Sequence, residues 1–277
     1  MKMMITTEVV NISPVMAEKW LKKNMINRPI SKSRVDSYAI DMKRGCWELN
    51  GEGIRFDEDG RLIDGQHRLS AIVKSNTVVT MVVTKGISKD VTLYDRGRNR
   101  SESDSLVIGG MDRTIANKNV CGAAKLHFYN QTRIPNVPFS FVKTFLEDNY
   151  TVFADVADIC KKGGQVNTKN GAFMLAYYYA LASGVPIETV TEFNKVVCLG
   201  FYEGEDKTAA IVLRNDILAG KLSAGGDRVN RLQLCFAVER AIYDFVHKKT
   251  RTRTYSSVDK GTYSVNEKFK ADVRGYM

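Results

Sequence analysis

The sequence has little of the chemistry that builds disulfide frameworks or metal clusters. Its five cysteines lie far apart in 277 residues, and no two of them form a Cys-x-x-Cys pair. The three histidines, His67, His127 and His247, are equally dispersed. This spacing indicates neither a disulfide framework nor a zinc knuckle, and it predicts that the cysteines are small core residues. A metal site assembled from carboxylates that are distant in the sequence stays open.

Long apolar runs are also missing. No stretch approaches the roughly 18 consecutive apolar residues that a membrane helix needs, and the start of the chain lacks the apolar region and cleavage site of a signal peptide. We therefore expect a soluble, cytoplasmic protein with no membrane partner. Hydrophobic residues make up 44% of the chain and charged residues 26%, which is ordinary for a globular protein, and the length gives room for one large domain or two smaller ones.

Acidic residues are outnumbered, with 31 Asp and Glu against 41 Lys and Arg, and the net charge is +10. Such a balance favours contact with polyanions such as DNA. The excess is uneven, because residues 248–277 hold eight Lys or Arg and three Asp or Glu. Within this stretch Lys248, Lys249, Arg251 and Arg253 are candidate nucleic-acid contacts. The alternative is an ordinary solvated basic surface.

The first part of the chain alternates short strand and helix patterns. Asp57-Glu58-Asp59-Gly60 is typical of a hairpin turn between two strands. Ser13-Pro14 predicts a helix start, because serine caps a helix and proline fits the first helical position. These patterns indicate a mixed α/β domain over residues 1–111. Its predicted strands cover residues 3–10, 53–56, 61–63 and 77–84, and its predicted helices begin at Pro14, at 31–33 and at 66.

The pattern changes beyond residue 111, where long helical stretches follow one another. Glycine-rich breaks such as Gly163-Gly164 and Gly225-Gly226 separate several of them. We therefore predict an α+β protein in which the mixed α/β domain is followed by an all-helical domain over residues 112–247 and a basic tail over 248–277. Tyr177-Tyr178-Tyr179 is expected to divide between core and helix surface. The predicted helices cover residues 114–130, 138–148, 150–161, 169–183, 186–201, 205–220 and 228–247.

The most informative segment runs from Asp64 to Arg68 and joins a predicted strand to a helix start. A helix start presents backbone N–H groups and the positive end of the helix dipole, and Arg68 adds a fixed charge that can hold two phosphate oxygens. Asp64 could cap the helix or hold a divalent cation, and Gly65 allows a positive φ. His67 could act as a general base. The alternatives are a plain helix cap, a structural histidine, and ion pairs from Arg68 to Asp64 or Glu52.

Three motifs in this part of the chain together resemble a known superfamily. They are Asn27-x-Pro29, Trp47-x-x-Asn50-Gly51-Glu52 and Asp64-Gly65-Gln66-His67-Arg68-x-x-Ala71. In this order they are similar to the ParB/sulfiredoxin superfamily, and most closely to the ParB N-terminal-like proteins of bacteriophages. The resemblance covers residues 5–110, well under half of the chain, and the Asp-Gly-Gln-His-Arg string after a strand is its most specific part.

The resemblance implies a ParB/sulfiredoxin-like nucleotide-binding domain in which this turn holds the phosphates of ATP or CTP. The candidate residues that follow from it lie in the turn or in the loops near it. The phosphate-binding candidates are Gly65, Gln66, His67, Arg68, Asn27 and Arg28. Asp64 and Glu52 are candidate ligands of a Mg²⁺ ion and, with His67, candidate catalytic residues.

This chain departs from the pattern of the superfamily at two points, and each departure removes one function that the resemblance would otherwise imply. Sulfiredoxins carry their reactive cysteine directly after the glycine of this turn, where this chain has Gln66, so thiol repair is excluded. Partition proteins carry two arginines in the turn and a helix-turn-helix region after the domain, whereas this chain has Arg68 alone and no DNA-reading helix that its sequence identifies. A sliding clamp for chromosome segregation is therefore not expected.

A second basic candidate consists of Arg96, Arg98 and Arg100. In an extended backbone these alternate residues would point to one side, where they could hold phosphate or nucleic acid. Related phage proteins carry a similar stretch after the motif strand. The alternative is a solvated loop in which the arginines pair with neighbouring carboxylates such as Asp95 and Glu102.

The leading hypothesis is a phage-type protein of the ParB/sulfiredoxin fold, acting on or near DNA in the host cytoplasm. It would bind a nucleoside triphosphate and hydrolyse it or transfer its phosphate. A non-catalytic DNA-binding or interaction protein that uses the basic loop and tail is the alternative. A metal-dependent nuclease, with scattered carboxylates such as Glu52, Asp64, Asp95 and Asp104, ranks third. Whether the protein forms a homodimer stays open.

Overall fold

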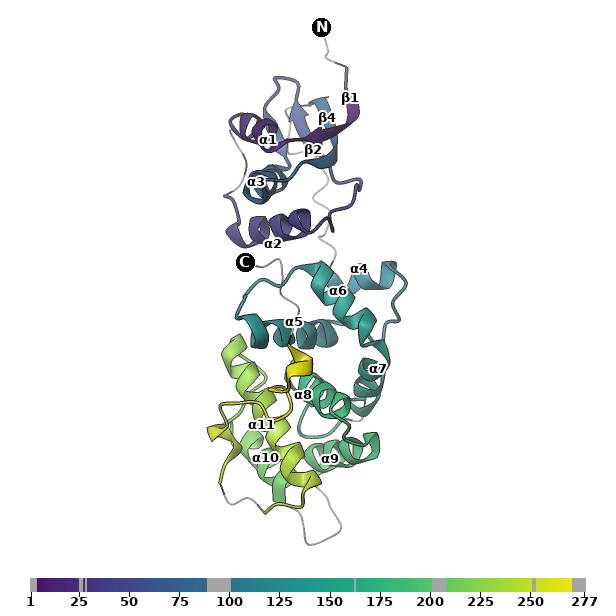
Figure 1. Ribbon diagram of the computed structural model, residues 1–277, viewed down its shortest axis with the longest axis vertical. Helices are drawn as coiled ribbons and strands as arrows, with labels where there is room; N and C mark the ends of the chain where they lie inside the picture. Colours follow the sequence, from purple (N-terminus) through teal and green to yellow (C-terminus); the bar gives the residue numbers. More distant parts are fainter. Residues whose placement is uncertain are drawn as a thin grey trace. The chain divides into compact units, whose positions relative to one another are not determined.

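A computed structural model of the protein describes residues 4–24, 27, 29–88, 101–161, 163–200, 208–250 and 253–270. The chain forms two compact units that divide between Asn99 and Arg100 (Figure 1). This division lies before the predicted boundary at residue 111, because α4 (Glu102–Ile108) packs against α5 (Lys118–Thr132) in the second unit. None of the helices in the described ranges is long and apolar enough to cross a bilayer.

The N-terminal unit is built around a four-stranded mixed sheet with the strand order β1-β4-β2-β3. β1 and β4 pair antiparallel, β4 and β2 pair parallel, and β2 and β3 pair antiparallel. This unit combines the sheet with helices, so it has the mixed α/β character that the sequence predicted. Its strands are β1 (Thr6–Ile12), β2 (Ile54–Asp57), β3 (Leu62–Asp64) and β4 (Val79–Ile87).

Local side-chain contacts account for the start of several elements. Asp57 Oδ1 accepts hydrogen bonds from Asp59 N at 2.9 Å and from Arg61 N at 2.7 Å, which fixes the hairpin between β2 and β3. Ser13 Oγ accepts a hydrogen bond at 3.2 Å from the backbone N–H of the third residue of α1 (Pro14–Leu21). The hairpin and this helix start were predicted from the same residues and are confirmed.

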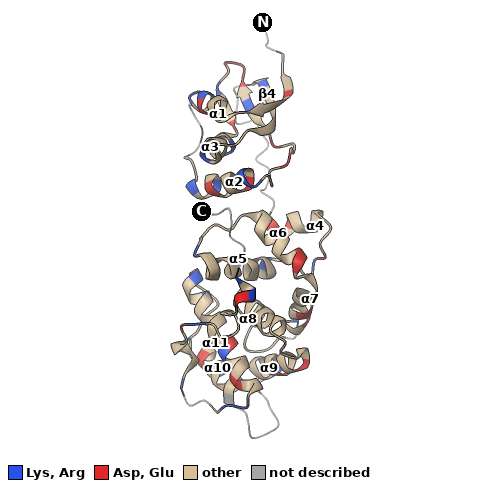
Figure 2. Cartoon of the chain, viewed as in Figure 1, with Lys and Arg blue, Asp and Glu red and all other residues tan. Residues whose placement is uncertain are grey.

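Helices complete the core of the N-terminal unit. α3 (Gln66–Ser75) lies between α1 and α2 (Lys32–Lys43) and packs against both (Figure 1). α2 turns Val35, Ala39 and Met42 towards the core, whereas acidic and basic residues are interspersed along its length (Figure 2). The apolar spacing of three and four residues thus sets which side of α2 is buried.

The C-terminal unit is helical in its described part, as predicted. Nearly all of α8 (Gly171–Ala182) is buried, since it packs against α5, α7, α9 and α11. The three consecutive tyrosines on α8 are therefore all buried, and the prediction that they divide between core and surface is wrong. The remaining helices are α6 (Phe139–Asp148), α7 (Tyr150–Ile159), α9 (Ile187–Leu199), α10 (Thr208–Leu218) and α11 (Arg228–Val246).

The basic tail belongs to the helical unit wherever it is described. The 3₁₀ helices η2 (Tyr255–Ser257) and η3 (Glu267–Phe269) each bury one aromatic side chain. Glu239 of α11, which is 0% exposed, accepts hydrogen bonds from the three backbone N–H groups of residues 262–264 at 2.8, 2.8 and 2.9 Å. Burial raises the pKa of this carboxyl group, and the three donors oppose that effect. They tie the C-terminal segment to α11.

Four of the five cysteines are buried, in agreement with the prediction that they are core residues. Cys46 is the exception and is exposed. It follows Gly45, which has a positive φ of 70° just beyond α2, and it lies in an exposed stretch over residues 43–46.

Candidate functional site

The segment from Asp64 to Arg68 lies where β3 ends and α3 begins. Gly65 is the N-cap residue of α3 and has a φ of 101°, in the left-handed region that favours glycine. A Cβ atom on this residue would lie 2.5 Å from Ile54 Cδ1 and 3.2 Å from Ile54 Cα. The turn therefore requires glycine for its backbone conformation and for its close approach to β2.

α3 begins at Gln66, as predicted, but its N-cap residue is Gly65, so Asp64 does not have the cap role that the sequence left open for it. Its Oδ1 accepts a hydrogen bond from Gly65 N at 2.7 Å, and its Oδ2 lies 3.1 Å from Arg68 Nη2 and 3.8 Å from Arg55 Nη1. Arg55 was not among the predicted site residues, although its place opposite Asp64 in the hairpin was a usable signal. The Asp64 carboxylate thus joins the turn, the helix and the neighbouring strand.

Arg68 is the centre of this charged cluster, and its side chain is 12% exposed. Nη2 donates to Gly53 O at 2.7 Å and to Asp64 Oδ2 at 3.1 Å, and Nη1 lies 3.6 Å from Glu52 Oε2. Nε is buried and has no hydrogen-bond partner among the described residues. The two ion pairs that the sequence left as an alternative for Arg68 are therefore present. The cluster of Arg68, Arg55, Asp64 and Glu52 contains as many positive as negative groups.

The side chains of Gln66, His67 and Asn27 make hydrogen bonds within the N-terminal unit. Gln66 Oε1 accepts a hydrogen bond from Asn24 Nδ2 at 2.8 Å, and His67 Nε2 accepts one from Ser31 N at 3.0 Å. Asn27 Nδ2 donates to a backbone carbonyl of β3 at 2.7 Å. These hydrogen bonds fasten the loop between α1 and α2 to α3 and β3, and the expectation that the three side chains hold phosphates stays a prediction. His67 Nε2, used as an acceptor here, does not offer a base at that nitrogen.

Asp64 and Glu52 are the carboxylates that could share a cation, since both contact the guanidinium group of Arg68. No cluster of three or more His, Cys, Asp or Glu side chains that could hold a metal occurs in the described ranges. A pair of carboxylates suits Mg²⁺, which keeps several waters and takes its remaining ligands from phosphate oxygens. This donor set therefore fits a Mg²⁺ ion that binds together with a nucleotide.

The predicted nucleic-acid contacts are described only in part. Lys248 and Lys249 lie exposed just beyond α11, and Lys249 Nζ is 4.7 Å from the centre of the Tyr243 ring. Arg253 is exposed as well. Arg28, Arg96, Arg98, Arg100 and Arg251 lie outside the described residues.

Comparisons of the chain with protein-family models, with curated proteins and with solved structures found no match. The resemblance to the ParB/sulfiredoxin superfamily therefore depends on the sequence motifs alone.

Proposed function

We propose that the N-terminal unit binds the phosphates of a nucleoside triphosphate at the start of α3, together with Mg²⁺. The observation that carries the proposal is Arg68, a largely buried arginine on the first turn of a helix whose N-cap glycine supplies no side-chain cap. A helix start of this kind beside a fixed positive charge suits phosphate oxygens. The motif resemblance supports the same site and favours ATP or CTP as the ligand.

Nucleotide binding would replace Glu52 by phosphate on Arg68. The Arg68–Glu52 pair is 3.6 Å long and Glu52 is 70% exposed, so the pair is worth less than about 1 kcal/mol. A forked arginine–phosphate contact is charge-assisted on both sides and stronger. Glu52, once it has left Arg68, can then hold Mg²⁺ together with Asp64. Without Mg²⁺ a triphosphate would face two carboxylates and two arginines among the described residues, so binding should require the cation.

In this proposal the described residues at the start of α3 act mainly by stabilising negative charge, and not by proton transfer. Arg68 and Mg²⁺ would stabilise the charge that develops on the terminal phosphate. His67 Nε2 already accepts the Ser31 N–H and so is not placed to take a proton from an attacking water at that nitrogen. We therefore expect the bound nucleotide to be hydrolysed slowly, as a phosphate-release assay would measure.

Isothermal titration with ATP and with CTP, in Mg²⁺ and in EDTA, tests the binding. Arg68→Lys keeps the charge but loses the planar fork, and it should weaken binding of the Mg²⁺ complex about tenfold or more. Glu52→Gln should weaken binding in Mg²⁺ and strengthen it in EDTA, because it removes a cation ligand and a competing charge. Equal binding by wild type and Arg68→Lys would overturn the proposal.

Two controls separate a lost site from a lost fold. Glu18→Gln changes an exposed carboxylate on α1 and should leave binding unchanged. Trp20 and Trp47 are the only tryptophans and both pack on the core of the N-terminal unit, so their fluorescence reports its folding in each variant.

A further inference from the structure

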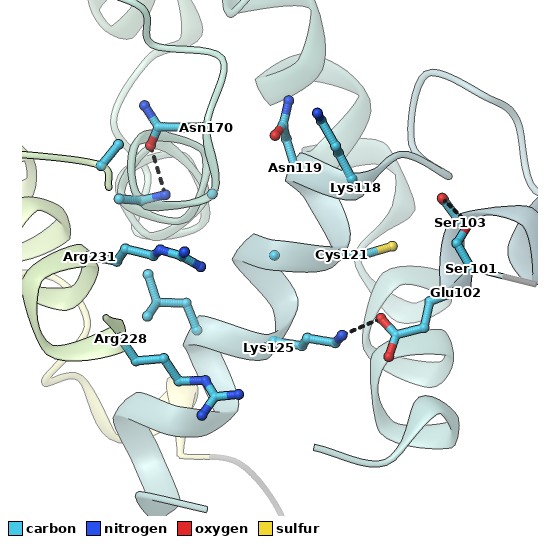
Figure 3. A pocket seen from close by; sticks show the side chains of 15 residues that line it. Ser101, Glu102, Ser103, Lys118, Asn119, Cys121, Lys125, Asn170, Arg228 and Arg231 are labelled. Carbon is cyan, nitrogen blue, oxygen red and sulfur yellow. Dashed lines mark hydrogen bonds and ion pairs between the residues drawn. The ribbon is translucent and has the colours of Figure 1, made fainter. Parts of the chain in front are cut away.

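A cavity of about 610 Å³ opens in the C-terminal unit (Figure 3). None of its lining residues belongs to the charged cluster around Arg68. Residues from the starts of α4, α5, α8 and α11 line it. In Figure 3, α5 runs between the two arginines of α11 and the start of α4. The volume falls within the range of roughly 300–1,000 Å³ that is usual for small-molecule sites.

The cavity is lined by four cationic side chains and one carboxylate. Glu102 pairs with Lys125, whose Nζ lies 2.5 Å from its Oε2. Lys118, Arg228 and Arg231 have no carboxylate partner among the residues that the structure describes. Arg231 donates one hydrogen bond to a backbone carbonyl at 3.2 Å, which leaves other N–H groups of its fork for a ligand. The lining thus holds three uncompensated positive charges.

Two glycines, Gly122 and Gly171, line the cavity, and close packing requires glycine at only one of these two positions. A Cβ atom on Gly171 would lie 3.0 Å from backbone atoms of α5, so this glycine lets α5 and α8 approach closely. A Cβ atom on Gly122 would meet nothing within 4 Å, and its φ is not in the left-handed region. Glycine inside a helix costs about 0.5–1 kcal/mol relative to alanine. Packing among the described residues therefore gives no reason for glycine at this position, and a side chain placed there would extend into open space.

We propose that this cavity binds a small molecule that carries several phosphate groups. Three cations without a carboxylate partner among the described residues line the same cavity, which suits a compact polyanion. Burial raises the pKa of Cys121 in the cavity wall to about 11, with Glu102 adding to the effect, so the thiol stays neutral and takes nothing from the positive charge. A single-stranded nucleic acid is less suited, because none of the lining residues is aromatic and bases would have nothing on which to stack.

Gly122 offers a direct test with inorganic tripolyphosphate as the probe, titrated into the full-length protein in EDTA. Gly122→Glu places a carboxylate in the open space and should weaken binding at least tenfold. Gly122→Ala is the matched control and should bind within about twofold of wild type. Both variants should be as stable as wild type or more so, because each removes a helix-interior glycine. Unchanged binding by Gly122→Glu would overturn the proposal.

Arginine variants decide the question if Gly122→Glu fails to fold. Arg231→Ala removes a charge-assisted contact and should weaken tripolyphosphate binding about tenfold or more. Lys195→Ala, an exposed change on α9 outside the cavity, should have no effect. Loss of the binding in Arg68→Lys would place it in the N-terminal unit and overturn the proposal. The proposal would also be overturned if the protein bound a short DNA duplex but not tripolyphosphate, and if Gly122→Glu abolished that DNA binding.

Discussion

Mild acid should destabilise the C-terminal unit through one buried imidazole, that of His127 on α5. The ring is 3% exposed, stacks on Phe145 with ring centres 4.4 Å apart, and shares a hydrogen bond of 2.9 Å between Nδ1 and Tyr179 Oη. Burial lowers its pKa from 6.5 to about 4. The folded unit therefore resists protonation that the unfolded chain accepts.

The sign and the size of the effect follow from that shift. A depressed folded-state pKa gives a stabilisation that is complete above about pH 6.5 and is lost as the pH falls towards 4. One pKa unit corresponds to about 1.4 kcal/mol, so the full loss is about 3 kcal/mol, of which about 2 kcal/mol has already gone at pH 5.

Urea denaturation of wild type and of His127→Gln, at about pH 7.5 and about pH 5, measures this loss. Far-ultraviolet circular dichroism follows mainly the helical unit, and the fluorescence of Trp20 and Trp47 follows the N-terminal unit as an internal control. Between the two pH values, the variant should lose about 2 kcal/mol less than wild type in the helical transition and the same amount in the fluorescence transition. Equal losses in the helical transition would refute the reasoning.

Three further predictions concern the fold. Gly65→Ala would place a side chain at a φ of 101° and in overlap with β2, so it should lower the urea midpoint of the fluorescence transition by the equivalent of about 1–3 kcal/mol. Gly51→Ala places its side chain in open space and should leave this midpoint unchanged. Glu239→Ala leaves the N–H groups of residues 262–264 without their acceptor, so the helical unit should lose about 2 kcal/mol or more by circular dichroism; an unchanged midpoint would contradict the role assigned to this carboxylate. Cys46 should react with a thiol reagent in the native protein while the other four cysteines react only after unfolding, and fast labelling of a second thiol would contradict their burial.

Element starts were predictable where a few neighbouring side chains decide them. Ser13 and Pro14 begin α1, and Asp57 holds the turn of the β2–β3 hairpin through its own side chain. α4 was missed because it has only seven residues and begins at a capping box of Ser101 and Asp104 within a polar stretch. A helix of that length depends on packing, here against α5, and not on its own sequence pattern. The sequence consequently placed the boundary at residue 111, beyond this helix.

In the candidate site, the sequence offered the ion pairs of Arg68 as one alternative, but the prediction included neither Arg55 nor the direction of every side chain. Asp64 and Arg68 are four residues apart, and their ion pair was foreseeable from that spacing. Gln66 and His67 instead contact the loop between α1 and α2, whose path is fixed only when these helices pack on α3. No local pattern carries that information. The cavity of the helical unit was missed for the same reason, since its cations come from separate helices.

The two proposed anion sites differ in charge balance, and this makes them separable by one reagent. Around Arg68 the described positive and negative groups are equal in number, so under the proposal a polyphosphate would need Mg²⁺ to bind there. The cavity beside Gly122 has three uncompensated cations and binds the free polyanion best. Mg²⁺ neutralises part of a polyphosphate, so it should strengthen binding at the first site and weaken it at the second. A change of the same sign at both sites would mean that charge balance does not govern them.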